Sequence, residues 1–142
     1  MKTAGMVMLA LAEIGSGSAT GQRVSLRQLA EAPKDYVGRT IVVSGIGCVD
    51  DPKDGFVCVA TVGGRAVRIE ASVLGAKTRQ EIAERLIGAC KGLSNLSRPA
   101  CRVDAEIEPR NAYVDTVETP DGSKAGIVVN SGAIDMYAPK RR

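Results

Sequence analysis

Apolar and polar residues alternate at a two-residue period in two segments of the chain. In residues 65–71, Val67, Ile69 and Ala71 fall on one face and the charged residues Arg68 and Glu70 on the other. Residues 101–108 repeat the pattern, with Cys, Val, Ala and Ile alternating with Arg, Asp and two Glu. Because successive side chains of a strand point to opposite faces, we expect two half-buried strands, each with an apolar and a solvated face.

Further strand-forming runs flank these two segments. Residues 40–49 are rich in Ile and Val, but Gly45 and Gly47 interrupt them, which predicts a strand with a bulge or a sharp bend. Glycine, proline and aspartate mark the expected turns. The turns are expected at residues 50–55, 63–64 and 120–122, and the other strands at 56–62, near 113–117 and 126–129, and at 133–137.

Two helices are predicted from their start signals. Ser25 and Gln28 have the spacing of a capping box, and Pro33 ends the short helix that follows. Thr78 and Glu81 have the same spacing, and the apolar residues after them recur at helical intervals up to Lys91. The sequence therefore predicts a short N-terminal helix and a longer one between two groups of strands.

The order of elements predicts a mainly β fold. Three strands, a helix and then two or three strands fit a five-stranded barrel whose helix lies between the third and fourth strands, which is the order of the OB-fold. Closing the sheet would remove its exposed edges. We expect one domain at residues 25–138, followed by a basic tail at 139–142.

One stretch of the chain also resembles a known class of proteins. Residues 25–29 (SLRQL) and 36–45 (YVGRTIVVSG) resemble the opening of exported bacterial OB-fold proteins of the tRNA-anticodon-binding-like kind. The resemblance covers about residues 25–72 and continues beyond them only in the order of elements. It implies an OB barrel and no particular ligand, because members of this class bind nucleic acids, peptides or sugars.

The N-terminus has the order of a signal peptide. Lys2 precedes an apolar run at residues 4–12, and a stretch of small residues ends at Ala19. Cleavage is expected after Ala19, with Ala12 as the alternative, and an ordinary N-terminal helix is the competing interpretation. No other segment has the apolar length of a membrane span. The expected location of the mature protein is the periplasm or the cell exterior.

Composition narrows the classes of function. The chain has 142 residues, 44% of them hydrophobic and 25% charged, and a formal net charge of +3. These values are typical of a globular domain. The sequence contains no His and no Trp, which excludes Ser-His-Asp and Cys-His catalysis and zinc sites that need imidazole.

The four cysteines support the predicted export, because small exported domains often contain disulfides. Cys48 and Cys58 lie symmetrically about a turn, as partners across a hairpin do, and Cys90 and Cys101 close the other short loop. We therefore predict disulfides 48–58 and 90–101. A zinc site and four free thiols are the alternatives, and the absence of a Cys-x-x-Cys motif speaks against the first and against redox catalysis.

Carboxylates are the main candidates for chemistry. Asp104, Glu106 and Glu108 form a row at strand spacing that could in principle perform acid–base catalysis or hold a hard cation. Their alternation with apolar residues favours a solvated face instead. The turn at residues 50–55 is acidic, but Pro52 and Thr61 occupy positions where a calcium loop needs ligands. We expect no catalytic residue, metal or cofactor.

The expected binding surface follows from the predicted fold. OB barrels bind ligands on their second and third strands and the flanking loops. The candidate residues there are Phe56, Arg65 and Arg68, with Asp50 and Asp54 in the adjoining turn. The alternative for the two arginines is an ordinary exposed strand face.

Three classes of function remain open. The leading hypothesis is a non-catalytic, exported OB-fold binding module whose ligand is a protein, peptide or oligomer of the cell envelope. The alternative is a single-stranded nucleic-acid-binding protein, although four aromatic residues and a charge of +3 give little stacking and little attraction for phosphates. The third class is a small hydrolase that uses the carboxylate row.

Overall fold

The computed structural model describes residues 19–140, so residues 1–18 of the predicted signal peptide lie outside the described part of the chain, as do residues 141–142 of the predicted tail. Strands dominate this part, and short helices connect them. The strands are β1 (Gln22–Arg23), β2 (Ile41–Asp51), β3 (Gly55–Val62), β4 (Arg65–Leu74), β5 (Arg102–Thr119) and β6 (Gly122–Tyr137). The helices are α2 (Leu26–Glu31), α3 (Gln80–Gly88) and the single turns Pro33–Tyr36, Leu93–Asn95 and Pro99–Cys101.

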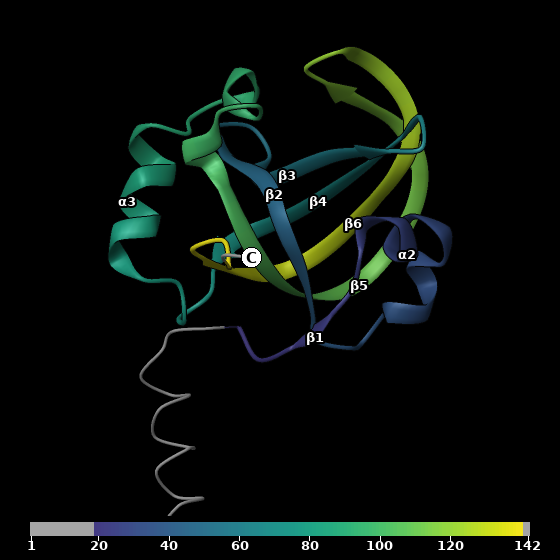
Figure 1. Ribbon diagram of the computed structural model, residues 1–142, viewed down its shortest axis with the longest axis horizontal. Coiled ribbons are helices and arrows are strands. Elements are labelled where there is room, and N and C mark those ends of the chain that lie inside the picture. The colour runs from purple at the N-terminus through teal and green to yellow at the C-terminus, as the bar shows by residue number, and fades with distance from the viewer. Residues whose placement is uncertain (1–18, 141–142) are drawn as a thin grey trace, which may run out of the picture.

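The strands form one sheet whose hydrogen bonding closes into a ring. The order is β1-β2-β3-β4-β6-β5, and β5 also pairs with β2. Neighbours are antiparallel except β1 with β2 and β4 with β6, which are parallel. Figure 1 shows the strands curving around a common axis. The expectation of a mainly β, barrel-like fold with a helix before the last two strands is confirmed at this level.

The strand count differs from the prediction, because the described sheet has six strands rather than five. The additional strand, β1, has two polar, exposed residues, which form no apolar pattern that a sequence could reveal. The expected short strands near residues 113–117 and 126–137 belong to two long strands, β5 with 18 residues and β6 with 16 residues, which form a hairpin. β5 passes Pro109 without ending, because irregular pairing on both sides of this residue removes the need for its missing amide.

The predicted bend in β2 is present. Gly45 has a φ of +61°, and the pairing with β5 shifts register between Val43 and Ile46. Gly47 has a separate role, since a Cβ at this position would collide with the carbonyl oxygen of Leu96. The two glycines therefore allow β2 to bend and another segment to pack directly on its backbone.

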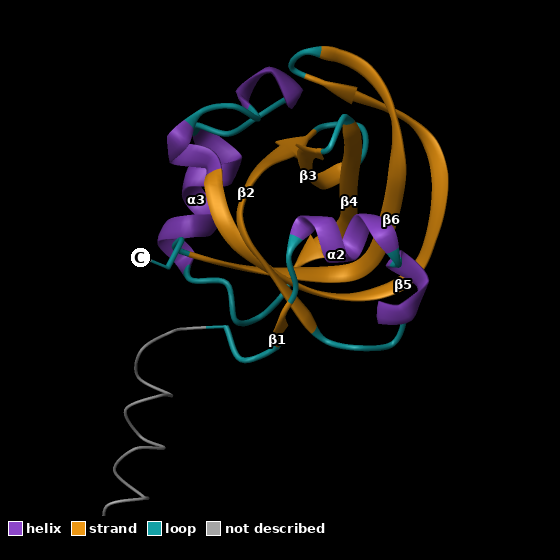
Figure 2. Ribbon diagram, turned by 45° about the vertical axis from the view of Figure 1, so that its right-hand side comes forward, coloured by secondary structure: helices purple, strands orange, loops and turns teal. Residues whose placement is uncertain are grey.

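The first predicted helix start is confirmed and the second is wrong. The hydroxyl of Ser25 accepts the amide of Gln28, whose side chain accepts the amide of Ser25 in return. Thr78 does not cap α3, whose N-cap is Arg79, because the Thr78 hydroxyl accepts the amide of Met136 instead. α2 packs against β3 and β4, and α3 packs against β2, on separate sides of the ring in Figure 2.

Both predicted disulfides join buried cysteines. Cys48 and Cys58 are direct neighbours across β2 and β3, with their Cα atoms 4.0 Å apart. Cys90 and Cys101 connect the end of α3 to the start of β5, with a Cα separation of 5.7 Å. All four side chains are part of the apolar core, so the bonds reinforce the region where β2, β3 and the α3 segment meet.

Residues 19–140 contain no helix with the length and hydrophobicity needed to span a bilayer.

Candidate ligand-binding groove

Two adjoining depressions form a polar groove across β4, β6 and β5, which run side by side in Figure 1. Their volumes are about 290 and 300 Å³, and they share Arg110, Ser131 and Gly132. The first is also lined by Thr40, Lys77, Glu106, Ile107, Glu108, Ala133 and Asp135, and the second by Asp54, Glu70, Ala71, Ser72, Asn111 and Asn130.

The irregularity of β5 around Pro109 shapes the middle of the groove. Its pairing with β6 shifts register on both sides of this proline. The hydroxyl of Ser131 accepts the amide of Glu108 and donates to the carbonyl of Ala133, so it satisfies backbone groups that the ladder leaves free. A Cβ at Gly132 would collide with the guanidinium of Arg110. The arginine therefore lies directly over the glycine, where a larger residue would displace it.

A row of polar side chains crosses the second depression. Glu70 pairs with Asn130 across β4 and β6, and Asn130 pairs with Asn111 across β6 and β5. The amide of Asn130 donates to the carbonyl oxygen of Asn111 over 2.7 Å, and the hydroxyl of Ser72 donates to the carbonyl of Gly132 over 3.0 Å. This row presents donors and acceptors at a regular cross-strand spacing.

Charge in the groove is uneven. Five carboxylates line it, from Asp54, Glu70, Glu106, Glu108 and Asp135, whereas Lys77 and Arg110 are its cations. Arg110 is exposed, and within residues 19–140 its guanidinium has no ion-pair or hydrogen-bond partner. In the groove, carboxylates therefore surround the guanidinium of Arg110, which has no hydrogen-bond or ion-pair partner among the described residues.

Of the five residues predicted for binding, the structure brings Asp54 and Arg68 together. The guanidinium of Arg68 contacts Asp54 at 2.9 Å and Glu70 at 2.5 Å, and both acids line the groove. The alternative that Arg68 stands on an exposed face is wrong, because it is only 9% exposed between the two carboxylates. Arg68 lies behind the groove and positions Asp54 and Glu70, two of the carboxylates that line it.

The other three predicted residues lie elsewhere. Phe56 points to the opposite face of β3 and packs against the core. Asp50 is held through its backbone, which bonds the Cys90 carbonyl and the Gly92 amide. Arg65 is exposed beside α2, in a small separate depression.

The two arginines should therefore differ in their effect on stability. Arg68→Ala leaves Asp54 and Glu70 without their shared partner and exposes the apolar residues beneath it, so we expect a loss of about 1–3 kcal/mol of unfolding free energy. Arg65→Ala, the matched control, should change it by less than about 0.5 kcal/mol. Urea denaturation of both variants measures the difference, and equal losses would contradict the assigned role of Arg68.

The expectation that the carboxylate row is solvated is wrong for two of its three members. Asp104 is 2% and Glu106 is 4% exposed, whereas Glu108 is exposed and lines the groove. Asp104 accepts the amides of Gly45 and Lys140 and pairs with Arg23 at 3.2 Å. Segments from both ends of the described chain cover this face, and the local alternation of residues 101–108 carries no information about them.

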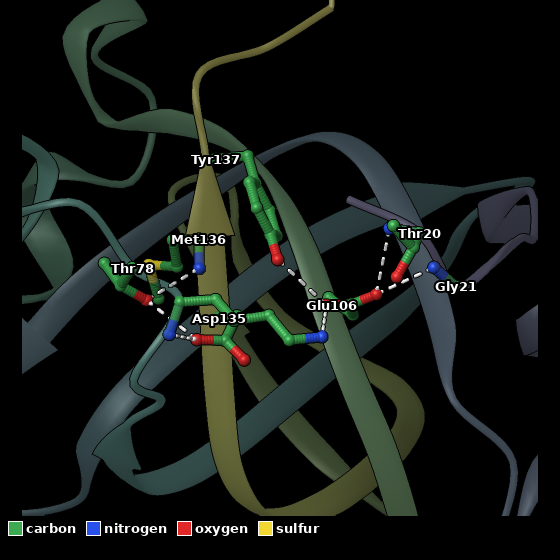
Figure 3. A network of polar contacts seen from close by, with 8 residues as sticks. Thr20, Gly21, Thr78, Glu106, Asp135, Met136 and Tyr137 are labelled. Atoms are coloured by element: carbon green, nitrogen blue, oxygen red, sulfur yellow. Dashed lines mark hydrogen bonds and ion pairs between the residues drawn. The ribbon is translucent and has the colours of Figure 1, made fainter. Parts of the chain in front are cut away.

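Glu106 is the centre of a network that joins the N-terminal segment to the last strand (Figure 3). One carboxylate oxygen accepts the amides of Gly21 at 2.7 Å and Thr20 at 3.2 Å. The other accepts the hydroxyl of Tyr137 at 3.0 Å and lies 3.5 Å from the ammonium of Lys77. Each oxygen thus receives two donors, which is the full capacity of a carboxylate.

These contacts shift two pKa values in opposite directions. Burial by itself would raise the pKa of Glu106, but the donors from Gly21, Tyr137 and Thr20 and the charge of Lys77 outweigh it and hold that pKa below its ordinary value. Burial and the hydrogen bond to the Glu106 carboxylate raise the pKa of Tyr137, with the Asp135 charge adding to the effect. Glu106 is therefore ionised and Tyr137 neutral at physiological pH.

The central residues of the groove were missed from the sequence. A proline inside a strand pattern and Gly132 in the last strand were the available signals for a bulge. They do not reveal that Arg110, Asn111 and Asn130 meet there, because that meeting depends on the register between two strands.

Comparisons with known proteins assign no family. No family model matches the chain, and no curated protein matches it. Among solved structures, the crystal structure of a putative aspartyl-tRNA synthetase from Leishmania major Friedlin is similar over 88% of this chain and 22% of that one, with 16% identity and a TM-score of 0.42. The chain thus spans about a fifth of the length of that protein, and the likeness is too low to assign a function.

Proposed function

We propose that this protein is a non-catalytic binding module that acts outside the cytoplasm and holds an extended ligand of the cell envelope, a protein segment, peptide or oligomer, in the groove across β4, β6 and β5. The observation that carries the proposal is the unengaged guanidinium of Arg110, positioned over Gly132 between two polar depressions. An exposed arginine whose donors are free is suited to a carbonyl or carboxylate of a ligand.

The extracytoplasmic location is supported by the cysteines. Two disulfides in a small domain are compatible with an oxidising compartment, where such bonds persist. The predicted signal peptide gives the same location independently. Together they support a ligand that is met outside the cytoplasm.

The chemistry of the groove favours a polar or basic ligand. Asn111, Asn130 and Ser72 offer amide and hydroxyl groups, which match the backbone of an extended peptide. The carboxylates of Asp54 and Glu70 would attract lysine or arginine side chains. A peptide segment with basic residues therefore fits better than a polyanion.

Absence of catalysis is supported by the state of the carboxylates. A general acid or base needs a pKa near the working pH and access to a substrate. Glu106 has a lowered pKa and four donors on its two oxygens, and Asp104 is buried beside Arg23. Glu106 therefore has its acceptor capacity filled, and Asp104 does not line the groove.

The binding proposal is tested with defined peptides. We expect mixed Ser/Gly/Lys decapeptides to bind the oxidised protein in calorimetric titration, and Ser/Gly/Glu decapeptides to bind much more weakly. Arg110→Ala should weaken binding at least about tenfold, since one charged hydrogen bond is lost, with the melting temperature unchanged. Arg65→Ala is the matched control, because this arginine is equally exposed but lies outside the groove. Equal affinity of the two variants, or no binding by any peptide, would contradict the proposal.

Single-stranded nucleic acid is the second candidate, and one observation favours it. Tyr113 on β5 is 45% exposed and lies opposite Val128, near the groove, where a base could stack on it. The excess of carboxylates opposes this function. A twelve-nucleotide oligothymidylate distinguishes the two, since its binding would fall steeply with salt and would depend on Tyr113.

A further inference from the structure

The first described residues of the chain are fixed on a buried charge. The amides of Thr20 and Gly21 both donate to the same oxygen of Glu106, at 3.2 and 2.7 Å. Glu106 is 4% exposed, whereas Thr20 is exposed. The nitrogen of Thr20, the atom that follows the predicted cleavage position, is thus in direct contact with a buried carboxylate.

We propose that the Ala19–Thr20 peptide bond is a processing site, and that the ammonium group released at Thr20 forms an ion pair with Glu106 that completes the fold. The reaction is hydrolysis by a signal-type peptidase. Water adds across the bond, Ala19 leaves with a carboxylate on the removed peptide, and the Thr20 nitrogen takes up a proton. This inference rests on the proposed export of the protein.

The geometry favours the ion pair over the amide contact that precedes it. Before cleavage, the Thr20 nitrogen offers Glu106 a single N–H at 3.2 Å. After cleavage, the same nitrogen carries a full positive charge and three donors. The other cation on this carboxylate is Lys77, at 3.5 Å with a side chain 60% exposed, so solvent weakens its attraction for Glu106. Processing therefore adds a second positive charge beside the buried carboxylate.

The charged and polar groups around Glu106 favour a positive charge at the Thr20 nitrogen. Tyr137 is neutral and donates to the other oxygen of Glu106. Asp135 lies opposite Glu106 across β6 and β5, and adds a second carboxylate to this face. The cation of Arg23 is already paired with Asp104. Negative charge therefore exceeds positive charge around Glu106 until the chain is cut.

The location of the cut distinguishes two sites in the sequence. Gly17 and Ala19 provide the small residues that a signal peptidase requires at the third and first positions before the cut. Cleavage after Ala12 would leave seven further residues and put the new ammonium away from Glu106 in the chain. Cleavage after Ala19 therefore permits the ion pair with Glu106, whereas cleavage after Ala12 does not.

The test compares four forms of the mature chain, with a free or an acetylated Thr20 nitrogen and with Glu106 or Glu106→Gln. Full-length protein is expressed in a host that exports it, and its intact mass is measured. We expect the mass of residues 20–142. The purified protein should melt about 5 °C higher than the same chain with an acetylated Thr20 nitrogen, because acetylation removes the charge and keeps the residue. Within the Glu106→Gln variant, where the charged partner is absent, the free and the acetylated chains should melt at the same temperature.

A second measurement does not depend on that variant folding. The α-amino group of Thr20, followed by nitrogen NMR, should titrate well above the usual value of about 7.7 for an N-terminus. A mass that retains Ala19, equal melting of free and acetylated chains, or an ordinary titration would each overturn the inference. Failure of peptide binding with these results intact would refute the proposed function alone.

Discussion

Reduction of both disulfides should remove a large part of the free energy of unfolding and lower the urea midpoint sharply. The bonds close loops with sequence separations of 10 and 11 residues, and loops of this length are each worth about 3 kcal/mol in the chain-entropy estimate. Their sum, about 6 kcal/mol, is comparable with the whole stability of a small domain, about 5–15 kcal/mol. Urea unfolding of oxidised and reduced protein measures the loss.

Pairwise variants separate the two contributions. Cys48→Ala with Cys58→Ala removes the bond between β2 and β3, and Cys90→Ala with Cys101→Ala removes the bond between α3 and β5. Each pair should lower the unfolding free energy by about 3 kcal/mol, with some additional loss from the removed sulfur atoms. An unchanged urea midpoint after reduction, with four alkylated thiols, would contradict the assigned role.

Glu106→Gln should produce the second large loss of stability, about 2–4 kcal/mol at neutral pH. The amide has the shape of the carboxylate but carries two donor hydrogens. These hydrogens face donors on either side, the Thr20 and Gly21 amides or the Tyr137 hydroxyl and Lys77 ammonium. Glu108→Gln, two residues along the same strand and exposed, is the matched control and should change stability little.

The effect of Glu106 should depend on pH in a defined direction. The folded-state pKa of Glu106 lies below its ordinary value of 4.5, so the folded protein binds the proton less readily than the unfolded chain. The stabilisation is therefore complete above pH 4.5 and is lost as the pH falls through the lowered pKa. The stability difference between the wild type and Glu106→Gln should shrink under acid. If the stability difference between the wild type and Glu106→Gln is the same at acidic pH as at pH 7, the charge of Glu106 does not contribute to stability.

Hydrophobic periodicity and capping residues were enough to predict the elements whose structure depends on neighbouring residues in the sequence. The β segments at residues 40–71, the bend at Gly45 and the capping box of Ser25 with Gln28 each depend on neighbours in sequence. The cysteine pairing was accessible for the same reason, since each pair spans about ten residues across one connection. Predictions failed where distant segments decide the environment.

Burial of Asp104 and Glu106 is the clearest failure. Their alternation with apolar residues is that of a solvated face, but Gly45, Lys140 and the segment at Thr20 supply donors to them. Thr78 illustrates the same effect, because its hydroxyl bonds Met136, far along the chain, rather than its own helix. A satisfied buried polar group leaves no signal in a hydrophobic pattern.

The candidate site could be predicted only in part. The turn acid Asp54 was found because the fold implied a binding surface near it, whereas the groove is centred on β6 rather than on the second and third strands. Arg110 and Gly132 meet because of the register shift around Pro109. That shift depends on pairing between long strands, which periodicity alone does not determine.

Amide chemical-shift mapping tests the central claim, that the groove is the ligand-binding site, most directly. Nitrogen-15-labelled oxidised protein is titrated with the Ser/Gly/Lys decapeptides. We expect saturable shifts concentrated at residues 70–72, 108–111 and 130–133, which need at least about tenfold more peptide in Arg110→Ala and are unchanged in Arg65→Ala. Shifts confined to other surfaces, or none at peptide concentrations in the millimolar range, would contradict it.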